Sequence, residues 1–406
     1  MKPPFSARCP NPAEHNAWSR AARDAGHSGS ALLDLTLSNP TRALLDRPLD
    51  PMCSAFMKSV RGAYSPHPQG DENAREAIST YHRDTHGVRV APRFVQLVAG
   101  TSQGYSFLFK LLTEPGDAVL VPSPGYPLFE HLLRLEGLRA ISYPLSVDTH
   151  WQIDFESLRA RLQPRTKAMI VVNPGNPTGT YLDRSSWDAI STFCRSHALT
   201  LISDEVFADY PLSTGNPAEG GYIPAARGLS DAVPAFTLSG LSKVLGLPQL
   251  KLSWILIHGS PEHREEARRR LEFIADLYLG ISAPVERALA RLMDARALFQ
   301  APIHSRVRSN NDALESMIDR TAGLSLLPAD AGWARIIRLP RVASEEALVL
   351  DLLKHARLLF HPGHFFDFDR EAFIVTSLLI PPDHLRDGIG RLNHRARLWM
   401  KGVRAG

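Results

Sequence analysis

Short apolar runs that alternate with helical patterns are the feature that most restricts how this chain folds. The runs are rich in Val, Ile and Leu and cover residues 95–98, 118–121, 168–172, 199–203, 235–238 and 252–257. Strands of this composition are buried on both faces, which is typical of a mostly parallel sheet covered by helices. Helical patterns lie between them, at 104–112, 128–136 and 185–197. The sequence therefore predicts an α/β fold with a doubly wound, mostly parallel sheet.

The two ends of the chain show a different pattern. The first 45 residues hold a helix-like start and a loop, and the residues from about 290 onward mix helices with short strands at 334–339 and 372–379. A chain of 406 residues, of which 44% are hydrophobic, is long enough for two domains. We therefore predict a large domain at 46–288 and a smaller α+β domain built from 1–45 and 289–406.

Charge, hydropathy and cysteine content exclude several classes of protein. The 46 Lys and Arg residues against 42 Asp and Glu residues leave a net charge of only +4, whereas nucleic-acid binders carry a concentrated basic patch. The basic stretch 263–270 contains glutamates and precedes apolar residues, as the solvated face of a helix does. No apolar run is long enough to span a bilayer, and the three cysteines form no CxxC pair. We therefore predict a cytoplasmic protein that binds neither nucleic acid nor membrane.

Ligands of open α/β sheets bind beyond the carboxyl ends of the strands, so the residues after each predicted strand are the candidates for chemistry. The first strand is followed by Thr101-Ser102-Gln103 at the start of a helix. Free N–H groups and the helix dipole make such a start an anion site, although Thr101 or Ser102 would also serve as an ordinary N-cap. The second strand is followed by a proline-rich loop that presents Tyr126, either to a pocket or to packing.

The loop after the third strand reads Asn-Pro-Gly-Asn-Pro-Thr-Gly at 173–179. Two Asn-Pro pairs in five residues force a rigid, extended turn, which holds the amide of Asn176 in place. A plain turn needs no such doubling, so we interpret this loop as a binding loop. The fourth strand ends at Asp204-Glu205, with no His or Cys at metal-ligand spacing, which favours pairing with a buried cation over a metal.

The loop after the fifth strand contains Ser242-Lys243, and Lys251 follows eight residues later. A lysine taken at random is a surface residue. A lysine held in a pocket with a lowered pKa forms Schiff bases, and the neighbouring motifs favour that interpretation for Lys243.

In their order along the chain, these motifs resemble the fold-type-I pyridoxal-phosphate enzymes, specifically the class I/II aminotransferase family. The resemblance covers roughly residues 30 to 395. It implies pyridoxal 5'-phosphate as the cofactor and Lys243 as the lysine that forms the Schiff base and then moves the proton between the substrate α-carbon and the cofactor. Asp204 would pair with the pyridine nitrogen and keep it protonated, so that the ring accepts electrons.

The same resemblance assigns the rest of the site. Asn176 would donate to the phenolate oxygen of the cofactor and face the substrate, and Tyr126 would stack on the ring. Tyr64 resembles the tyrosine that reaches the phosphate from the partner subunit, which implies a homodimer with shared active sites. Ser38 lies where the family often has a glycine on the substrate side. The remaining phosphate ligands would be Thr101, Ser102, Gln103, Ser242 and Lys251.

The chain departs from the family pattern at several positions. Phe207 replaces a tyrosine that donates to the phenolate oxygen, which leaves Asn176 as the main donor. Gly240 replaces a serine that binds the phosphate, and Lys251 offers a point charge where an arginine would offer a fork. Val375, twelve residues after a Pro-Gly pair, replaces the arginine that clamps the substrate α-carboxylate.

Without that clamp, we expect ordinary α-amino acids to bind weakly unless another cation substitutes. The sequence does not choose among the candidate cations, which are Arg42, Arg370 and Arg386. A histidine cluster lies near the same region, at His355, His361 and His364, but its spacing matches no common zinc pattern, so we predict no metal site. A contact of His361 or His364 with substrate is the alternative.

The leading hypothesis is an aminotransferase that moves an amino group from an amino donor to a keto or aldehyde acceptor. A β-lyase, a decarboxylase or an amine oxidase on the same fold would use the same Lys243 and Asp204. A non-catalytic regulatory or binding protein on this fold is the alternative from a different class. Regulators of this kind carry a DNA-binding domain ahead of the fold, and only about 30 residues precede the first family-like segment.

Overall fold

The computed structural model of the protein describes residues 5–9, 17–27, 32–43, 45–46, 49–61, 63–213, 221–368 and 372–402. Its fourteen α-helices within these residues are α1 (Ala17–His27), α2 (Leu49–Ser59), α3 (Glu72–His86), α4 (Thr101–Leu112), α5 (Phe129–Leu135), α6 (Phe155–Arg161), α7 (Arg184–Ser196), α8 (Ala225–Gly228), α9 (Leu241–Val244), α10 (Pro261–Asp276), α11 (Ala283–Asp294), α12 (Arg296–Met317), α13 (Glu345–Asp351) and α14 (Pro382–Met400). None of these helices has both the length and the apolar character that crossing a membrane requires.

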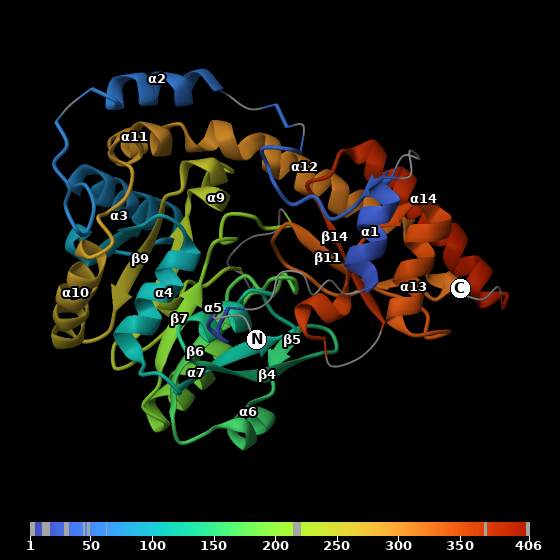
Figure 1. Ribbon diagram of the computed structural model, residues 1–406, viewed down its shortest axis with the longest axis horizontal. Coiled ribbons are helices and arrows are strands. Elements are labelled where there is room, and N and C mark those ends of the chain that lie inside the picture. The colour runs from blue at the N-terminus through green and yellow to red at the C-terminus, as the bar shows by residue number, and fades with distance from the viewer. Residues whose placement is uncertain are drawn as a thin grey trace.

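An eight-stranded sheet forms the larger part of the molecule (Figure 1). Its strands, in spatial order, are β2 (Val95–Val98), β9 (Ser253–His258), β8 (Ala235–Gly240), β7 (Thr200–Asp204), β6 (Thr166–Val172), β3 (Ala118–Ser123), β4 (Arg139–Val147) and β5 (Trp151–Ile153). The five strands from β8 to β4 run parallel, and antiparallel strands flank them at both edges. This confirms the predicted α/β class with a mostly parallel sheet.

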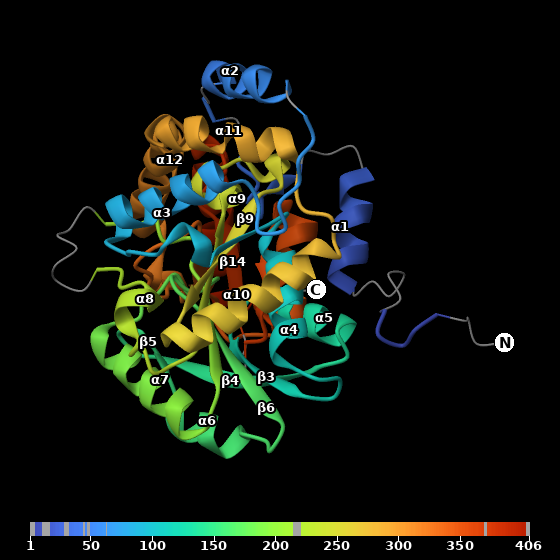
Figure 2. The same cartoon turned by 90° about the vertical axis from the view of Figure 1, so that its left-hand side faces the viewer.

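Helices cover both faces of this sheet, which is why its strands have no polar face. One apolar cluster joins α4, α5 and α10 to one face, and a second joins α6, α7 and α8 to the other. Figure 2 shows α6 and α7 on the opposite side of the strands from α4 and α5. Local chemistry sets the helix ends: Asp183 caps the first turn of α7 through the Ser186 amide, and Gly87 ends α3 in the left-handed region with φ 66°.

A second, smaller layer is built from the later part of the chain and from an early segment. Its antiparallel sheet has the order β10 (Ser325–Leu326), β11 (Ala334–Arg338), β14 (Phe373–Ser377) and β13 (His361–Pro362), and β1 (Leu33–Asp34) pairs with β12 (Leu358–Leu359). Helices α12, α13 and α14 pack around it, and α1 lies beside α13. Figure 1 shows α1 among these late helices, so an early and a late segment of the chain lie side by side there.

Helix α12 connects the two parts of the molecule. Phe299, in its first turn, packs in the apolar cluster of α3 and α11, whereas Ile303, Val307 and Leu314 pack in the cluster around the smaller sheet. Helix α12 therefore contributes side chains to both apolar cores. The division of the chain at 46–288 remains a prediction.

Candidate active site

Four polar loops meet at one edge of the large sheet, where the parallel strands end. Asp204 is the last residue of β7, and Lys243 lies three residues beyond the neighbouring strand β8. Asn176 follows β6, and Tyr126 follows β3. Because these four strands are adjacent and parallel, the loops at their carboxyl ends lie side by side. The predicted convergence of these residues on one site follows directly from the strand order.

Lys243 has a largely apolar environment. Its amine lies 4.9 Å from the centroid of the Phe207 ring and 4.6 Å from that of Trp333. Burial lowers the pKa of Lys243 to about 8, against the opposing effect of the Asp204 charge. About half of this amine is therefore neutral near pH 8, which is the form that attacks a carbonyl carbon.

Asp204 is a buried carboxylate, with 7% of its surface exposed. One oxygen accepts a hydrogen bond from the Tyr105 hydroxyl at 2.9 Å, and the other accepts from the Val206 amide at 3.2 Å. Burial raises the pKa of Asp204, and the two hydrogen bonds and the Lys243 charge oppose it. Across the part of the chain that the structure describes, no ion pair within 4.0 Å includes Asp204. A buried carboxylate of this kind is suited to a cationic partner on a ligand.

Tyr126 lies close to the same carboxylate. Burial first, and then the charge of Asp204, raises the pKa of the Tyr126 hydroxyl. Its ring packs edge-on against Phe129 with the centroids 5.6 Å apart, which fixes its orientation at the end of β3.

The two asparagines of the 173–179 loop have different roles. Asn173 is fully buried and anchors the loop, since its amide donates to the Ile223 carbonyl at 2.8 Å and accepts from the Leu182 amide at 3.0 Å. Asn176 instead lines a pocket together with Pro122 and Trp151. The loop therefore leaves Asn176 partly exposed at this pocket.

A positively charged site lies at the start of α4. A Cβ atom built on Gly100, the N-cap of this helix, would lie 3.7 Å from the Lys251 amine. The lysine is therefore close to the free amide groups of the first turn, which include those of Thr101 and Ser102. Gln103 is partly engaged, because its side-chain oxygen accepts from the Ala99 amide at 2.7 Å. Among the described residues its side-chain nitrogen has no hydrogen-bond acceptor, so its two N–H donors could serve a ligand.

Gly240 lies directly opposite Ser253 in the pairing of β8 with β9. A Cβ atom at Gly240 would lie only 2.1 Å from the Ser253 hydroxyl oxygen. The space that a serine at 240 would occupy therefore already contains a hydroxyl group, supplied by the neighbouring strand. The sequence showed the missing serine but not this replacement, because the two positions are 13 residues apart.

Three other predicted residues occupy distinct places around the site. Ser242 is half-buried in α9, next to Lys243. Ser38 is exposed in a loop whose Pro40 would lie 3.4 Å from a Cβ at Gly246, so this loop abuts the turn after the lysine. Tyr64 is 70% exposed in the extended segment before α3.

The environment of Val375 is apolar. Its side chain is 2% exposed and packs in a cluster with Trp151 and Phe366, and its backbone lies between those of Ile336 and His361 in the smaller sheet. The Arg338 guanidinium lies 5.8 Å from the centroid of the Phe373 ring, which belongs to the same cluster.

The candidate substitutes for an arginine at 375 are dispersed. Arg386 is 54% exposed and pairs with Asp383 on α14, and Arg42 is exposed in the loop before α2. Arg370 lies outside the described residues.

The histidines near this region have separate partners. His355 lies 3.0 Å from Asp351, and His364 lies 3.0 Å from Glu345. His361 packs against the Trp18 ring. Within the described ranges, no group of three or more His, Cys, Asp or Glu side chains is arranged to hold a metal ion.

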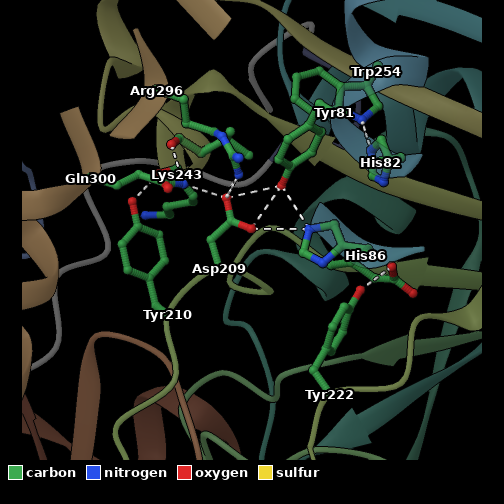
Figure 3. A network of polar contacts seen from close by, with 12 residues as sticks. Tyr81, His82, His86, Asp209, Tyr210, Tyr222, Lys243, Trp254, Arg296 and Gln300 are labelled. Carbon is green, nitrogen blue, oxygen red and sulfur yellow. Dashed lines mark hydrogen bonds and ion pairs between the residues drawn. The ribbon is translucent and has the colours of Figure 1, made fainter. Parts of the chain in front are cut away.

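Several residues of the site were not predicted from the sequence. Tyr105 lies one helical turn after Thr101, and this spacing was the one available signal that it faces the sheet edge. Trp333 lies directly before β11, 90 residues beyond Lys243. Tyr210 donates its hydroxyl to the Lys243 carbonyl at 2.6 Å, as Figure 3 shows. No sequence pattern marks Trp333 or Tyr210, because tertiary packing alone brings them to the lysine.

The chain is similar in sequence to known aminotransferases. The chain is 24% identical over 365 residues to the glutamate-pyruvate aminotransferase AlaA of Haemophilus influenzae, covering 88% of this chain and 86% of that protein. It is 27% identical over 374 residues to an alanine aminotransferase of Mycobacterium bovis, covering 88% and 81%.

Solved structures show the same fold. An alanine aminotransferase from Pyrococcus furiosus superposes with a TM-score of 0.84 at 23% identity, over 94% of this chain and 96% of that one. The family model for aminotransferases of class I and II matches residues 41–386. The chain therefore belongs to the class I and II aminotransferase family and is an enzyme that transfers amino groups.

Proposed function

We propose that the protein is a pyridoxal-phosphate-dependent aminotransferase in which Lys243 forms the Schiff base. The observation that carries this proposal is that the Lys243 amine and the Asp204 carboxylate are both buried at the ends of neighbouring strands. The two groups lie near each other but form no direct ion pair, so each can bind a ligand. Lys251 at the start of α4 adds a site for a phosphate. These three groups have the charges that the cofactor requires, so the donor set fits it.

The bound cofactor supplies a carbonyl carbon for amine exchange and a ring that accepts electrons. Asp204 would pair with the ring nitrogen, and its buried position makes that charge effective. Tyr126 would stack on the ring, and Asn176 would donate to the ring oxygen. Phe207 and Trp333 keep water away from the lysine amine, which then moves the proton at the substrate α-carbon.

At the phosphate end, Thr101, Ser102, Gln103, Ser242 and Lys251 would hold the phosphate with the free amides of α4. Ser253 joins this set because its hydroxyl fills the space beside Gly240. A hydroxyl that donates to a phosphate oxygen makes a charge-assisted hydrogen bond.

Exchanging the residues at positions 240 and 253 tests the role of Ser253. The variant Ser253→Gly should weaken cofactor binding about 10- to 100-fold, since a hydrogen bond to a charged group contributes roughly 1.5–3 kcal/mol. Gly240→Ser alone should destabilise the protein, because its new Cβ would overlap Ser253. The double variant Gly240→Ser/Ser253→Gly should recover cofactor affinity to within about threefold. Equilibrium dialysis measures the affinities, and a double variant no better than Ser253→Gly would contradict the assignment.

The substrate side of the site determines which amines react. Val375 and Trp151 form an apolar wall where a guanidinium fork would bind an α-carboxylate. Trp151 also lines the pocket that contains Asn176. We therefore propose that the donor is recognised mainly through its amine and an apolar substituent, with little dependence on an α-carboxylate.

Absorbance spectroscopy with matched donor pairs tests both the chemistry and this preference. Each pair differs only in the α-carboxylate, as phenylalanine and phenethylamine do. We expect donors to bleach the visible band of the loaded protein while a pyridoxamine band grows in. Within a pair, kcat/KM should differ by less than about 10-fold, because the roughly 1.5–3 kcal/mol of a charge-assisted clamp is absent. A preference for the amino acid above about 100-fold would show that another cation replaces the clamp. Bound cofactor that no donor converts would instead favour lyase, decarboxylase or oxidase chemistry.

A homodimer would complete the site through Tyr64. Its side chain is exposed, and exposed Met57 (71%) and Val60 (62%) lie near it in the sequence, at the end of α2. Exposed apolar side chains close together are suited to a subunit interface. We propose that this part of the large domain, at 46–288, faces a second copy of the chain.

A further inference from the structure

The helix that carries Lys243 is too short to hold itself in place. Helix α9 has four residues, Leu241–Val244, and a single helical turn has little stability of its own. The carbonyl groups at its carboxyl end need donors from elsewhere. The Lys243 carbonyl accepts from the Gly246 amide at 3.1 Å and from the Tyr210 hydroxyl at 2.6 Å. The Val244 carbonyl accepts from the side-chain amide of Gln300 at 2.9 Å.

Gln300 is itself held by a buried carboxylate. The same amide nitrogen that donates to Val244 also donates to Asp209 at 2.5 Å, so one side chain bridges the lysine helix and the acid. Gln300 lies near the start of α12, the helix shared by both cores, and is 7% exposed. Figure 3 shows the Gln300 side chain beside Lys243 and directed toward Asp209.

Asp209 is surrounded by groups that keep it charged and fixed. The Tyr81 hydroxyl lies 3.0 and 3.1 Å from its two oxygens, His86 Nε2 lies 3.1 Å away, and the Arg296 guanidinium lies 3.9 Å away. Burial alone would raise the pKa of Asp209, but His86 and Arg296 outweigh it and lower the pKa. A buried charge with so many partners contributes little net stability, which points to a positional role.

The network does not form a proton path to the lysine. On the lysine side it ends at the backbone carbonyls of Lys243 and Val244, which do not transfer protons at neutral pH. On the far side, His86 meets Tyr222 only through an edge-on ring contact at 5.3 Å. The geometry therefore suits positioning and not proton transfer.

We propose that Asp209 and Gln300 are positioning residues that clamp the carboxyl end of α9 and thereby fix the direction of the Lys243 amine. The inference rests on the proposed role of Lys243. It also gives α12 a function, because this helix would transmit its own position to the lysine through Gln300.

The variant Gln300→Met tests the clamp, since it keeps the length of the side chain and removes both hydrogen bonds. Asn310→Leu is the matched control: Asn310 is a buried amide on the same helix that donates to the carbonyls of Leu378 and Ile380, both at 2.8 Å. Both variants lose two hydrogen bonds from α12, but only Gln300→Met touches the lysine helix.

The first readout uses cofactor-free protein and no turnover. Acetylation of Lys243 is followed against pH by mass spectrometry of its peptide, starting from a midpoint near the pKa of about 8. A loosened helix lets water reach the amine, so the midpoint should rise by about one unit in Gln300→Met, and the reactive fraction at pH 8 should fall about fivefold. The loaded enzyme should show kcat lowered about 10-fold with KM changed less than about threefold. Asn310→Leu should move neither quantity.

Asp209→Asn should shift the midpoint in the same direction, and adding Gln300→Met to it should cause no further shift, because both act through one contact. Equal effects of Gln300→Met and Asn310→Leu, or an unmoved midpoint, would overturn the inference even if Asp209→Asn fails to fold. Wild-type protein in which Lys243 shows no unusual reactivity and no Lys243-dependent visible band would instead overturn the proposed function, so the two failures are distinguishable.

Discussion

Replacing Lys243 with alanine should abolish the visible absorbance band of the cofactor-loaded protein and lower kcat by about 10⁴-fold or more. Lys251, the other lysine assigned to the site, does not substitute for it, because its amine lies near the start of α4, where it is proposed to bind the phosphate. Spectra recorded with pyridoxal phosphate, together with stopped-flow measurement of the half-reaction, check both effects. Lys110→Ala is the control, because Lys110 pairs with Glu136 away from the site and should leave both readouts unchanged.

The pH dependence of stability shows whether a Lys243 variant is inactive because it lacks the amine or because its fold is destabilised. The pKa of Lys243 is lowered to about 8 in the folded, cofactor-free protein, against 10.5 for an ordinary lysine. The unfolded chain therefore binds more protons between these values, so wild-type stability rises as the pH rises from about 8 to 10.5. Lys243→Met removes the free-energy cost of burying a charged amine. The melting temperature of this variant at pH 7 should therefore equal or exceed that of the wild type. An inactive Lys243→Met that also melts earlier at pH 7 would show that the lysine supports the fold and not only the chemistry.

The fold was predictable because burial on both faces leaves a strong sequence pattern. All six strands predicted for the large sheet occur, each within two residues of its predicted ends. Two strands of the large sheet were missed, the edge strand β5 and its neighbour β4, because their residues are not continuously buried. Edge strands need not be continuously apolar, so the pattern that identifies central strands does not find them.

The site was predictable only where its residues follow a strand directly. Asp204, Asn176 and Tyr126 were found in this way, since the strand order alone brings them together. Ser253 and Gln300 were not, because each reaches the site through packing between segments far apart in the sequence. The sequence shows that position 375 is apolar. Only the structure shows that Val375 packs in an apolar cluster with Trp151 and Phe366.

Asp204→Asn should lower kcat by about 10²–10³-fold while the visible band persists. The amide keeps the size of the carboxylate and can still accept a hydrogen bond from Tyr105, so the pocket stays intact. The neutral side chain no longer holds a proton on the ring nitrogen, and the ring accepts electrons less well. The visible band remains because Lys243 is unchanged. Half-reaction kinetics and spectra on the same samples measure both quantities.

Glu205→Gln provides a control with the same change one residue further along the chain. Glu205 is also buried, but its carboxylate accepts from Ser203, Ala225 and Tyr222 on the side of α8. Losing that charge should affect stability and change kcat by less than about threefold, because this carboxylate is held by other partners and does not face the ring nitrogen. Comparable losses of kcat in the two variants would mean that a general loss of buried charge, and not the pairing of Asp204 with the ring, limits the reaction.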